Sequence, residues 1–236
     1  MYNKYIFINN NRRKKQKELE EKKKQEEPQI SFDILMQENI KQKDIKVSES
    51  TNKISNSLTT MNNRKNLNKF VDDYVLVDIE TTGLSPITDE IIEIGAIKVK
   101  QNKIVDKYNE LIKVNRVISP FITNLTGITN EMLQTGKNPI TVYKEFIDFI
   151  GENVIIGHNV NFDLGFLTDK CKKYINYNLT NDYVDTMYLA RKLVKDTMNY
   201  KLGTLAEYFN VSYEGAHRGL KDVEITYEVY NCLRKI

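Results

Sequence analysis

The sequence predicts an α/β domain, in which helices pack on a mixed β-sheet, after a polar and basic N-terminal extension. Three observations support this prediction. In the second part of the chain, apolar runs of strand length alternate with segments whose apolar residues have helical spacing. All ten glycines follow residue 80. The first part of the chain is dominated by charged and amide side chains. Because tight turns and helix ends favour glycine, only the second part contains the turn residues of a packed fold.

The extension is expected to cover residues 1–70, disordered or partly helical, and the folded domain residues 71–236. The extension has 16 Lys and Arg against 9 Asp and Glu, and the domain 19 against 23, within a chain of 236 residues and net charge +3. Residues 12–27 form a dense charge run with too little apolar surface to offset the entropy lost on ordering. The extension is interpreted either as a flexible segment or as an electrostatic arm that follows nucleic-acid phosphates. Its apolar stretch, residues 30–36, is either a docking segment for a partner or a transient helix.

The elements of the domain follow from apolar patterning. Runs rich in Val, Ile and Leu predict strands, and apolar residues at intervals of three and four predict helices. Residues 100–102 separate the second strand from the third, a length that suits a hairpin, and Asn161 is expected to cap the helix after the fourth strand. The predicted strands are residues 73–78, 90–99, 103–114, 153–157 and 183–185. The predicted helices are residues 139–150, 161–175, 186–195, 202–209 and 218–235.

Several protein classes are excluded by composition. No apolar window reaches the ~18 residues of a membrane span, and the first residues have the wrong order of apolar and basic parts for a secretory signal. The two cysteines, Cys171 and Cys232, cannot build a disulfide framework or a cysteine-rich metal site. A soluble, cytoplasmic protein of a reducing compartment is therefore expected.

Two acidic residues end the first predicted strand. Strand alternation places Asp78 and Glu80 on the same face, and residues 81–84, Thr-Thr-Gly-Leu, follow them. Two carboxylates ~7 Å apart on one face can bind one hard cation. An apolar strand that ends in two acids breaks the local pattern, as functional sites often do. The alternative is an ordinary acidic strand end.

Two further acidic residues and one histidine follow in the second half of the domain. Asp163 lies in the first turn of a predicted helix, where the helix dipole also favours an acid without any function. Asp222 lies inside the last predicted helix, and His217 is expected in the loop before it, because five residues along one helix would not share a face. A neutral imidazole there can take a proton from water near pH 7. The other histidine, His158, is assigned no catalytic role.

Together these residues predict metal-dependent phosphoryl transfer. Four carboxylates without a Cys or multi-His cluster favour Mg²⁺ or Mn²⁺ over zinc. A pair of such ions ~3.5–4 Å apart stabilises the attacking and leaving oxygens of an in-line displacement, with the histidine available as the base for water.

The motifs resemble those of a known superfamily. The segments 78–84 (DIETTGL) and 158–163 (HNVNFD), and the H-x₄-D spacing of His217 and Asp222, occur in the order of the three motifs of DEDD exonucleases, specifically the histidine (DEDDh) branch. The nearest resemblance is to the proofreading epsilon subunit of bacterial DNA polymerase III and to the exonuclease domain of the related large polymerase. It implies a ribonuclease-H-like fold, a five-stranded mixed sheet flanked by helices, over residues 71–236.

The resemblance also implies an activity and residue roles. Nucleoside 5′-monophosphates would be removed one at a time from a single-stranded or frayed DNA 3′ end, in proofreading or repair, with His217 as general base. Two Mg²⁺ or Mn²⁺ ions would be held by Asp78, Glu80, Asp163 and Asp222. The terminal nucleotide would be contacted by Thr81, Thr82, Gly83, Leu84, Ile128 and Phe162. Ile128 and Phe162 are equally candidates for the core.

Two alternatives remain open from the sequence. One is an exoribonuclease of the same branch, because the motifs do not fix whether the pocket accepts a 2′-hydroxyl group. The other is an inactive module that only binds 3′ ends or a partner. The last predicted helix ends near Ile236, where free-standing epsilon subunits usually continue into a polymerase-binding extension, so a polymerase-bound role and a stand-alone repair role are both considered.

Overall fold

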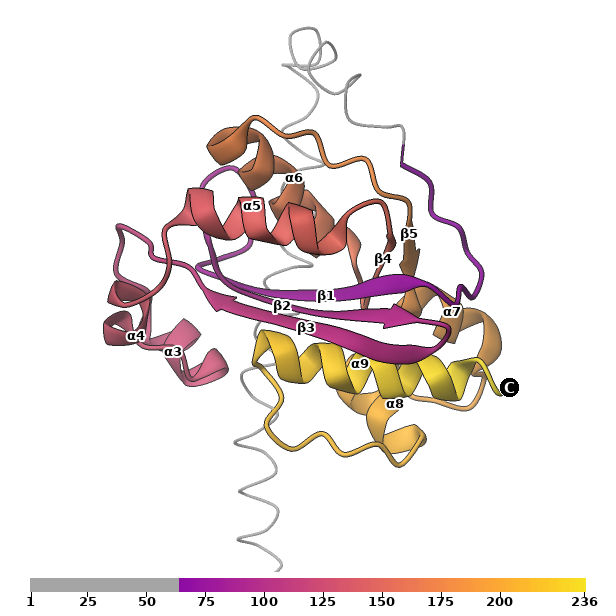
Figure 1. The fold of residues 1–236 in the computed structure, drawn as a ribbon. Helices are drawn as coiled ribbons and strands as arrows, with labels where there is room; N and C mark the ends of the chain where they lie inside the picture. Colours follow the sequence, from indigo (N-terminus) through magenta and orange to yellow (C-terminus); the bar gives the residue numbers. More distant parts are fainter. Residues whose placement is uncertain (1–63) are drawn as a thin grey trace, which may run out of the picture. The chain divides into compact units, whose positions relative to one another are not determined.

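The computed structural model describes residues 64–236. The charge run at residues 12–27 and the apolar stretch at residues 30–36 lie outside the described residues. Five strands form one sheet in the order β3-β2-β1-β4-β5. The central strand β1 pairs antiparallel with β2 and parallel with β4 (Figure 1), so the predicted mixed sheet is confirmed. The strands are β1 (Tyr74–Thr81), β2 (Ile91–Lys100), β3 (Lys103–Leu111), β4 (Val154–Gly157) and β5 (Tyr183–Asp185).

Helices cover both faces of the sheet. In Figure 1, α5 and α6 lie on one face and α9 with α8 on the other, while α3 and α4 lie together beside one end of the sheet. The helices are α3 (Pro120–Thr126), α4 (Asn130–Gln134), α5 (Pro139–Ile150), α6 (Asn161–Ile175), α7 (Thr186–Leu193), α8 (Leu202–Tyr208) and α9 (Gly219–Leu233).

Alternation along β1 separates two hydrophobic cores. Val75, Val77 and Ile79 pack with residues of α5 and α6, whereas Tyr74 and Leu76 pack with residues of α7, α8 and α9. Successive side chains of a strand point to opposite faces, so the even-numbered residues that follow Leu76 also point toward α9. This alternation determines the face of the sheet on which the acidic residues of β1 lie.

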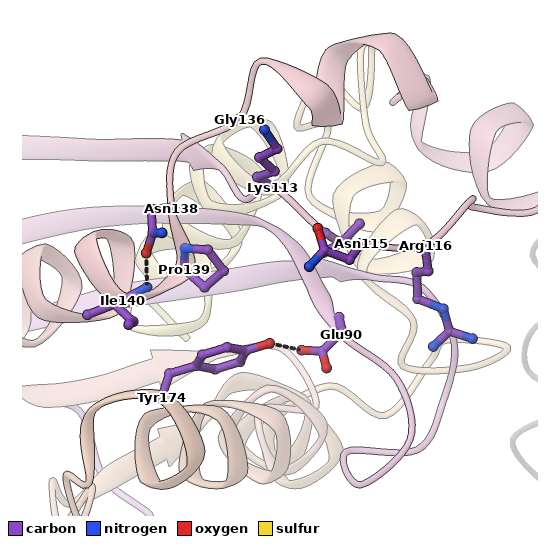
Figure 2. Close-up of a pocket in the computed structure, with 10 residues that line it drawn as sticks. Glu90, Lys113, Asn115, Arg116, Gly136, Asn138, Pro139, Ile140 and Tyr174 are labelled. Atoms are coloured by element: carbon purple, nitrogen blue, oxygen red, sulfur yellow. Dashed lines mark hydrogen bonds between the residues drawn. The ribbon is translucent and has the colours of Figure 1, made fainter.

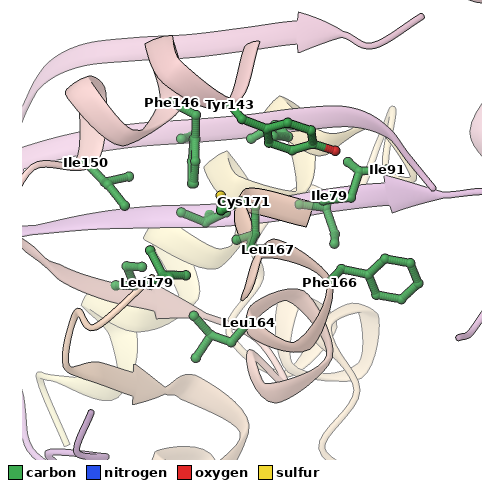
Figure 3. Packing of buried hydrophobic residues seen from close by; sticks show 14 of the residues in the cluster. Ile79, Ile91, Tyr143, Phe146, Ile150, Leu164, Phe166, Leu167, Cys171 and Leu179 are labelled. Carbon is green, nitrogen blue, oxygen red and sulfur yellow. The ribbon is translucent and has the colours of Figure 1, made fainter. Parts of the chain in front are cut away.

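The core under α5 and α6 contains large, fully buried side chains. Tyr143 and Phe146 of α5 meet Leu167 and Cys171 of α6 over the sheet (Figure 3). These residues recur at three- and four-residue intervals within each helix, and this spacing places them on one face. The helix predicted at residues 139–150 is therefore found with the predicted bounds.

The start of α6 differs from the prediction. Asn161 was expected to cap the helix, but it is the first helical residue, and the capping position is Val160, which makes no side-chain capping bond. The reason is the turn before it, where Asn159 adopts a left-handed conformation (φ 60°) and its backbone N–H donates to Asp185 Oδ1 at 3.0 Å. This turn is fixed by a residue of β5, so the helix can begin without a side-chain cap.

The helices α3 and α4 were not predicted. They have seven and five residues, too few for an apolar period to be recognised. Ser119 and Thr129 accept hydrogen bonds from backbone N–H groups of the first turns, and Gly127 ends α3 at φ 71°. These helices exist because of their capping residues and because they cover Ile92 at the beginning of β2.

The last residues of the predicted extension contact the domain. Lys65 and Leu67 exchange backbone hydrogen bonds with Tyr183 of the edge strand β5, each at 2.9 Å. The ring of Phe70 lies 5.3 Å from that of Tyr230 on α9. The division of the chain near residue 70 stays a prediction, although residues 64–70 are packed against the domain.

The described residues bear on two features considered in the sequence, membrane-spanning segments and the two cysteines. Among residues 64–236, no helix combines the length and the apolar character that a membrane span requires. Cys171 is buried, Cys232 is partly buried, and both are free thiols.

The start of α9 touches β2 backbone to backbone. A Cβ added to Gly95 of β2 would lie 2.1 Å from the carbonyl carbon of Gly219, the first residue of α9. No real Cβ approaches a backbone atom this closely, so both positions require a residue without a side chain. This contact determines how closely the start of α9 approaches the sheet.

We expect Gly95→Ala to lower the free energy of unfolding by about 1–3 kcal/mol, because α9 must move away from the sheet. The matched control is Gly165→Ala in the interior of α6, where an added Cβ would meet Pro86 Cγ at an ordinary 3.5 Å. Replacing a helix-interior glycine by alanine is expected to stabilise the protein by about 0.5–1 kcal/mol. Urea denaturation of the three proteins measures both effects, and equal losses in the two variants would contradict the prediction.

Candidate active site

Three carboxylates meet where β1 faces the start of α9. Asp78, Glu80 and Asp222 each offer an oxygen atom, and these atoms lie within 4.8 Å of one another. Asp78 and Glu80 point to the α9 side by strand alternation, and Asp222 lies in the first turn of α9, only 8% exposed. We call these three residues the acid cluster. The structure thus brings together three of the four predicted carboxylates.

Negative charge is unfavourable in the acid cluster. Burial raises the pKa of Asp78 and of Glu80 well above the usual range, and repulsion by Asp222 raises both pKa values further. Burial also raises the pKa of Asp222 to about 7, although the backbone N–H of His217 opposes this shift. Asp222 Oδ1 is buried and has no hydrogen-bond partner among the described residues. Mutually repelling carboxylates at close range, with one buried oxygen left unpartnered, fit a hard divalent cation.

Asp163 lies beside this group without being one of its three members. It is in the first turn of α6, is 5% exposed, and its Oδ1 accepts the backbone N–H of Ile79 at 3.2 Å. Burial raises the pKa of Asp163 to about 8 against the lowering effect of its backbone hydrogen bonds. Its charge also contributes to the raised pKa values of Asp78 and Glu80, so it belongs to the same electrostatic site.

His217 lies in the loop before α9, where the sequence places it. Its backbone adopts φ 67°, and its N–H donates to Asp222 Oδ2 at 3.0 Å. Burial lowers the pKa of the imidazole below its usual value, so the ring is neutral at pH 7. Its backbone and Asp222 therefore form one local unit.

His158 has a structural role. Its Nδ1 lies 2.9 Å from Thr186 Oγ1 and its Nε2 lies 2.8 Å from the carbonyl oxygen of Tyr200. Burial lowers the pKa of this imidazole to about 4. Both ring nitrogens are therefore occupied by hydrogen bonds within the domain.

The turn after β1 is held by its own hydrogen bonds. The N–H of Thr82 donates to the carbonyl of Glu90 at 2.9 Å, and Thr81 Oγ1 donates to the carbonyl of Gly83 at 2.6 Å. The Asp89 carboxylate accepts the N–H of Ser85 at 3.0 Å. A Cβ on Gly83 would lie 2.6 Å from Asp89 Cγ, so glycine is required for this arrangement. The predicted substrate residues Thr81, Thr82, Gly83 and Leu84 therefore lie on a turn with a defined conformation.

The two predicted apolar substrate contacts differ in exposure. Ile128 is fully buried in the core formed by α3, α4 and Ile92, which favours the core interpretation of this residue. Phe162 is partly buried in the first turn of α6, next to Asp163, and its ring lies 5.0 Å from that of Phe166.

Sequence reasoning missed three charged residues around the site. Glu93 is a fully buried acid on β2. Arg218, which directly precedes α9, forms an ion pair with Glu93, with 2.8 Å between Arg218 Nη2 and Glu93 Oε1. Lys170 of α6 is fully buried and donates to the carbonyl of Pro86 at 2.7 Å, so it fixes the far side of the turn after β1. For Glu93, the available signal was an acid within an otherwise apolar strand.

A cleft of about 760 Å³ lies near the same turn. Its carboxylate, Glu90, is hydrogen-bonded to Tyr174 at 3.3 Å (Figure 2). The same carboxylate is paired with Lys173 at 2.7 Å. Residues that line it are Glu90, Lys113, Val114, Asn115, Arg116, Gly136, Asn138, Pro139, Ile140 and Tyr174. None of the predicted site residues lines this cleft, and its acid is already neutralised. The acid cluster is therefore the stronger candidate for chemistry.

Comparisons with known proteins identify relatives of this region. The family model for exonucleases (RNase T) matches residues 75–230, which include the acid cluster, Asp163 and His217. The PolC-type DNA polymerase III of Caldanaerobacter subterraneus is 44% identical over 158 residues, which cover 67% of this chain and 11% of the polymerase. That of Bacillus subtilis is 38% identical over 156 residues, 66% of this chain and 11% of the polymerase. The chain thus spans about a tenth of the length of the relatives it matches.

Solved structures share the fold. Escherichia coli exonuclease I in complex with single-stranded DNA superposes with a TM-score of 0.62 at 18% identity, over 70% of this chain and 41% of that one. Exonuclease X in complex with 5′-overhanging duplex DNA gives a TM-score of 0.56 at 26% identity, over 69% of this chain and 91% of that one. The predicted ribonuclease-H-like fold is thereby confirmed. Because one family model matches more than half of the chain and the matched range contains all three motifs, the chain belongs to the exonuclease family of the DEDD superfamily.

Proposed function

We propose that residues 71–236 act as a metal-dependent 3′→5′ exonuclease that releases nucleoside 5′-monophosphates from DNA 3′ ends. The observation that carries this proposal is the acid cluster, in which one buried and two partly buried carboxylates converge, with an unpartnered oxygen on Asp222. The PolC-type relatives are DNA polymerases, and exonuclease I and exonuclease X have been solved with DNA. These relatives support DNA as the substrate and a polymerase or repair partner.

The acid cluster would hold the metal, and Asp163 would help to hold a second ion. All four side chains supply only oxygen ligands, which suit Mg²⁺ or Mn²⁺. When bound, the ions supply positive charge for the attacking and leaving oxygens of the phosphodiester. Lys221 and Arg218 lower the pKa values of Asp222 and Glu80, respectively, but burial and repulsion outweigh both effects. The protein's own cations therefore do not stabilise the ionised carboxylates enough to bring their pKa values back to the usual range.

His217 would act as the general base. Its imidazole is neutral at pH 7 because burial lowers its pKa, so a ring nitrogen can accept a proton from the attacking water. The hydrogen bond from its backbone N–H to Asp222 couples the position of the base to that of a metal ligand.

The terminal nucleotide would bind over the turn after β1. The turn of Thr81, Thr82, Gly83 and Leu84 is already ordered by its hydrogen bonds, so little entropy is lost when a nucleotide contacts it. Phe162, which is partly buried beside Asp163, would contact a sugar or base with its ring. Ile128 is fully buried in the core of α3, α4 and Ile92, which disfavours a direct contact with the nucleotide.

Incubation with labelled oligonucleotides tests the activity. We expect the wild-type protein to shorten 5′-labelled single-stranded DNA stepwise from its 3′ end with Mg²⁺ or Mn²⁺, and to lose this activity in EDTA. Asp78→Asn should abolish turnover, and His217→Ala should lower it by about 10²–10⁴-fold, the usual contribution of a general base. Glu224→Gln, an exposed acid on α9 that pairs with Lys107, is the control expected to behave as wild type.

The same gel separates the alternatives. Faster shortening of a matched RNA strand would indicate an exoribonuclease. No shortening of either strand by correctly folded wild-type protein would contradict an enzyme and would favour a module that only binds 3′ ends.

The raised pKa values predict how pH acts on stability without metal. Asp222 and Asp163 titrate at about 7 and about 8 in the folded protein, above their unfolded values of about 3.9, so folding takes up protons between these limits. The metal-free folded state is therefore stabilised by protonation of these two carboxyl groups. The full stabilisation is present below the pKa of the unfolded state and is lost as the pH rises through the pKa values of the folded state. In EDTA, we expect the melting temperature to fall between pH 6 and pH 8.5, and to fall less in Asp163→Asn. Added Mn²⁺ should raise the melting temperature most at high pH. A melting temperature in EDTA that does not change with pH would contradict the raised pKa values of Asp163 and Asp222.

A further inference from the structure

A carboxylate outside the acid cluster organises the loop that carries His217. Glu93 is fully buried on β2 and lies directly across the ladder from Glu80. Its Oε2 accepts the Arg218 Nε–H at 3.1 Å and the backbone N–H of Gly219 at 2.9 Å, and its Oε1 accepts Arg218 Nη2–H at 2.8 Å. The carboxylate is thus bidentate toward one guanidinium and also receives the first N–H of α9.

These contacts replace a missing helix cap. The capping position of α9 is Arg218, which makes no side-chain capping bond of its own. The carboxylate that meets the N-terminus of α9 comes from the neighbouring strand, and a negative charge is favoured there by the helix dipole. Two residues further along β2, Gly95 makes the close backbone contact with Gly219. The start of α9 is therefore attached to β2 by two separate interactions.

The contacts also limit what Glu93 can do. Its charge adds to the repulsion that raises the pKa values of Glu80 and Asp222, so it is costly in this position unless it is well paired. Arg218 and Gly219 occupy both of its oxygens, and Asn109 Nδ2 lies 3.4 Å from Oε1. Glu93 is therefore used for hydrogen bonding to the loop and is not one of the three residues of the acid cluster.

We propose that Glu93 is a positioning residue for the exonuclease reaction. Through Arg218 and the N–H of Gly219, it holds the turn that carries His217 before α9. The hydrogen bond between the His217 N–H and Asp222 makes the turn and the helix start move together. This inference rests on the proposed function, because it assigns Glu93 a role in the same site.

The kinetic test compares Glu93→Gln with the control Glu224→Gln, which removes an exposed acid from α9. In Glu93→Gln, one oxygen becomes an N–H₂ group that cannot accept the Arg218 or Gly219 hydrogen bonds. We expect kcat to fall about 10- to 100-fold, the scale of a displacement of about 1 Å at a reacting group, while KM changes little. Arg218→Lys keeps the charge but loses the bidentate geometry, and should lower kcat in the same way.

If Glu93→Gln does not fold, Arg218→Lys decides the kinetic test. An unchanged kcat in the folded variants would overturn the inference.

A double variant separates positioning from a direct electrostatic effect on the site. If Glu93 acts by holding the turn of His217, adding Glu93→Gln to His217→Ala should cost less than about 3-fold further, because residues that act as a unit are not additive. A further loss as large as in the wild-type background would show that Glu93 acts independently of His217, which contradicts the proposal.

Hydrogen–deuterium exchange tests the same contact without activity. Peptides that cover residues 214–222 should exchange faster in Glu93→Gln and Arg218→Lys than in wild type and Glu224→Gln, while peptides of α5 and α6 stay unchanged. Unchanged exchange at residues 214–222 would overturn the inference, and so would a uniform increase over the whole domain. If the wild-type protein does not shorten DNA, the proposed function fails, and the exchange result still decides whether Glu93 holds the turn.

Discussion

The close contact between Gly95 and Gly219 is the constraint on which the acid cluster depends. Asp78 and Glu80 are placed on one face by the alternation of β1, but Asp222 reaches them only because the start of α9 lies against the neighbouring strand without an intervening Cβ. Each side chain larger than glycine at this contact would separate the helix from the sheet. Packing of the core that contains Tyr74 and Leu76 holds the remainder of α9 on the same face, so the position of the acids is a consequence of burial elsewhere.

The acids of this domain fall into two electrostatic groups. Glu90 and Glu93 are both compensated, by Lys173 and by Arg218 respectively. No ion pair between described residues involves Asp78, Glu80 or Asp222, and their pKa values rise accordingly. A fold that pairs two acids near its site but leaves three others to repel one another makes ionisation of these three unfavourable. Repulsion of this kind lowers the stability of the metal-free domain, and a bound cation relieves it.

Most of the fold could be predicted because its long elements are defined by apolar periodicity. The period along residues 139–150 and the alternation along β1 each reflect one buried face, so the sequence alone determines them. The same alternation places Asp78 and Glu80 together. The helices α3 and α4 escaped prediction because they depend on caps and on a surface supplied by β2. Asn161 was misassigned because a hydrogen bond to Asp185 orders the preceding turn. Glu93 left only a weak signal, since its partners become neighbours through the tertiary fold.

The backbone of His217 explains why so many interactions converge on one loop. A residue with a side chain at φ 67° is in a sparsely populated conformation, and such strain persists only where the surroundings fix it. Here the His217 N–H is bound to Asp222 on the helix side, and the two following residues are bound to Glu93 on the sheet side. The first interaction depends on a residue of the acid cluster, and the second on an acid outside it. Loss of either would allow the turn to relax toward a more common conformation, so the placement of the imidazole depends on both β2 and α9.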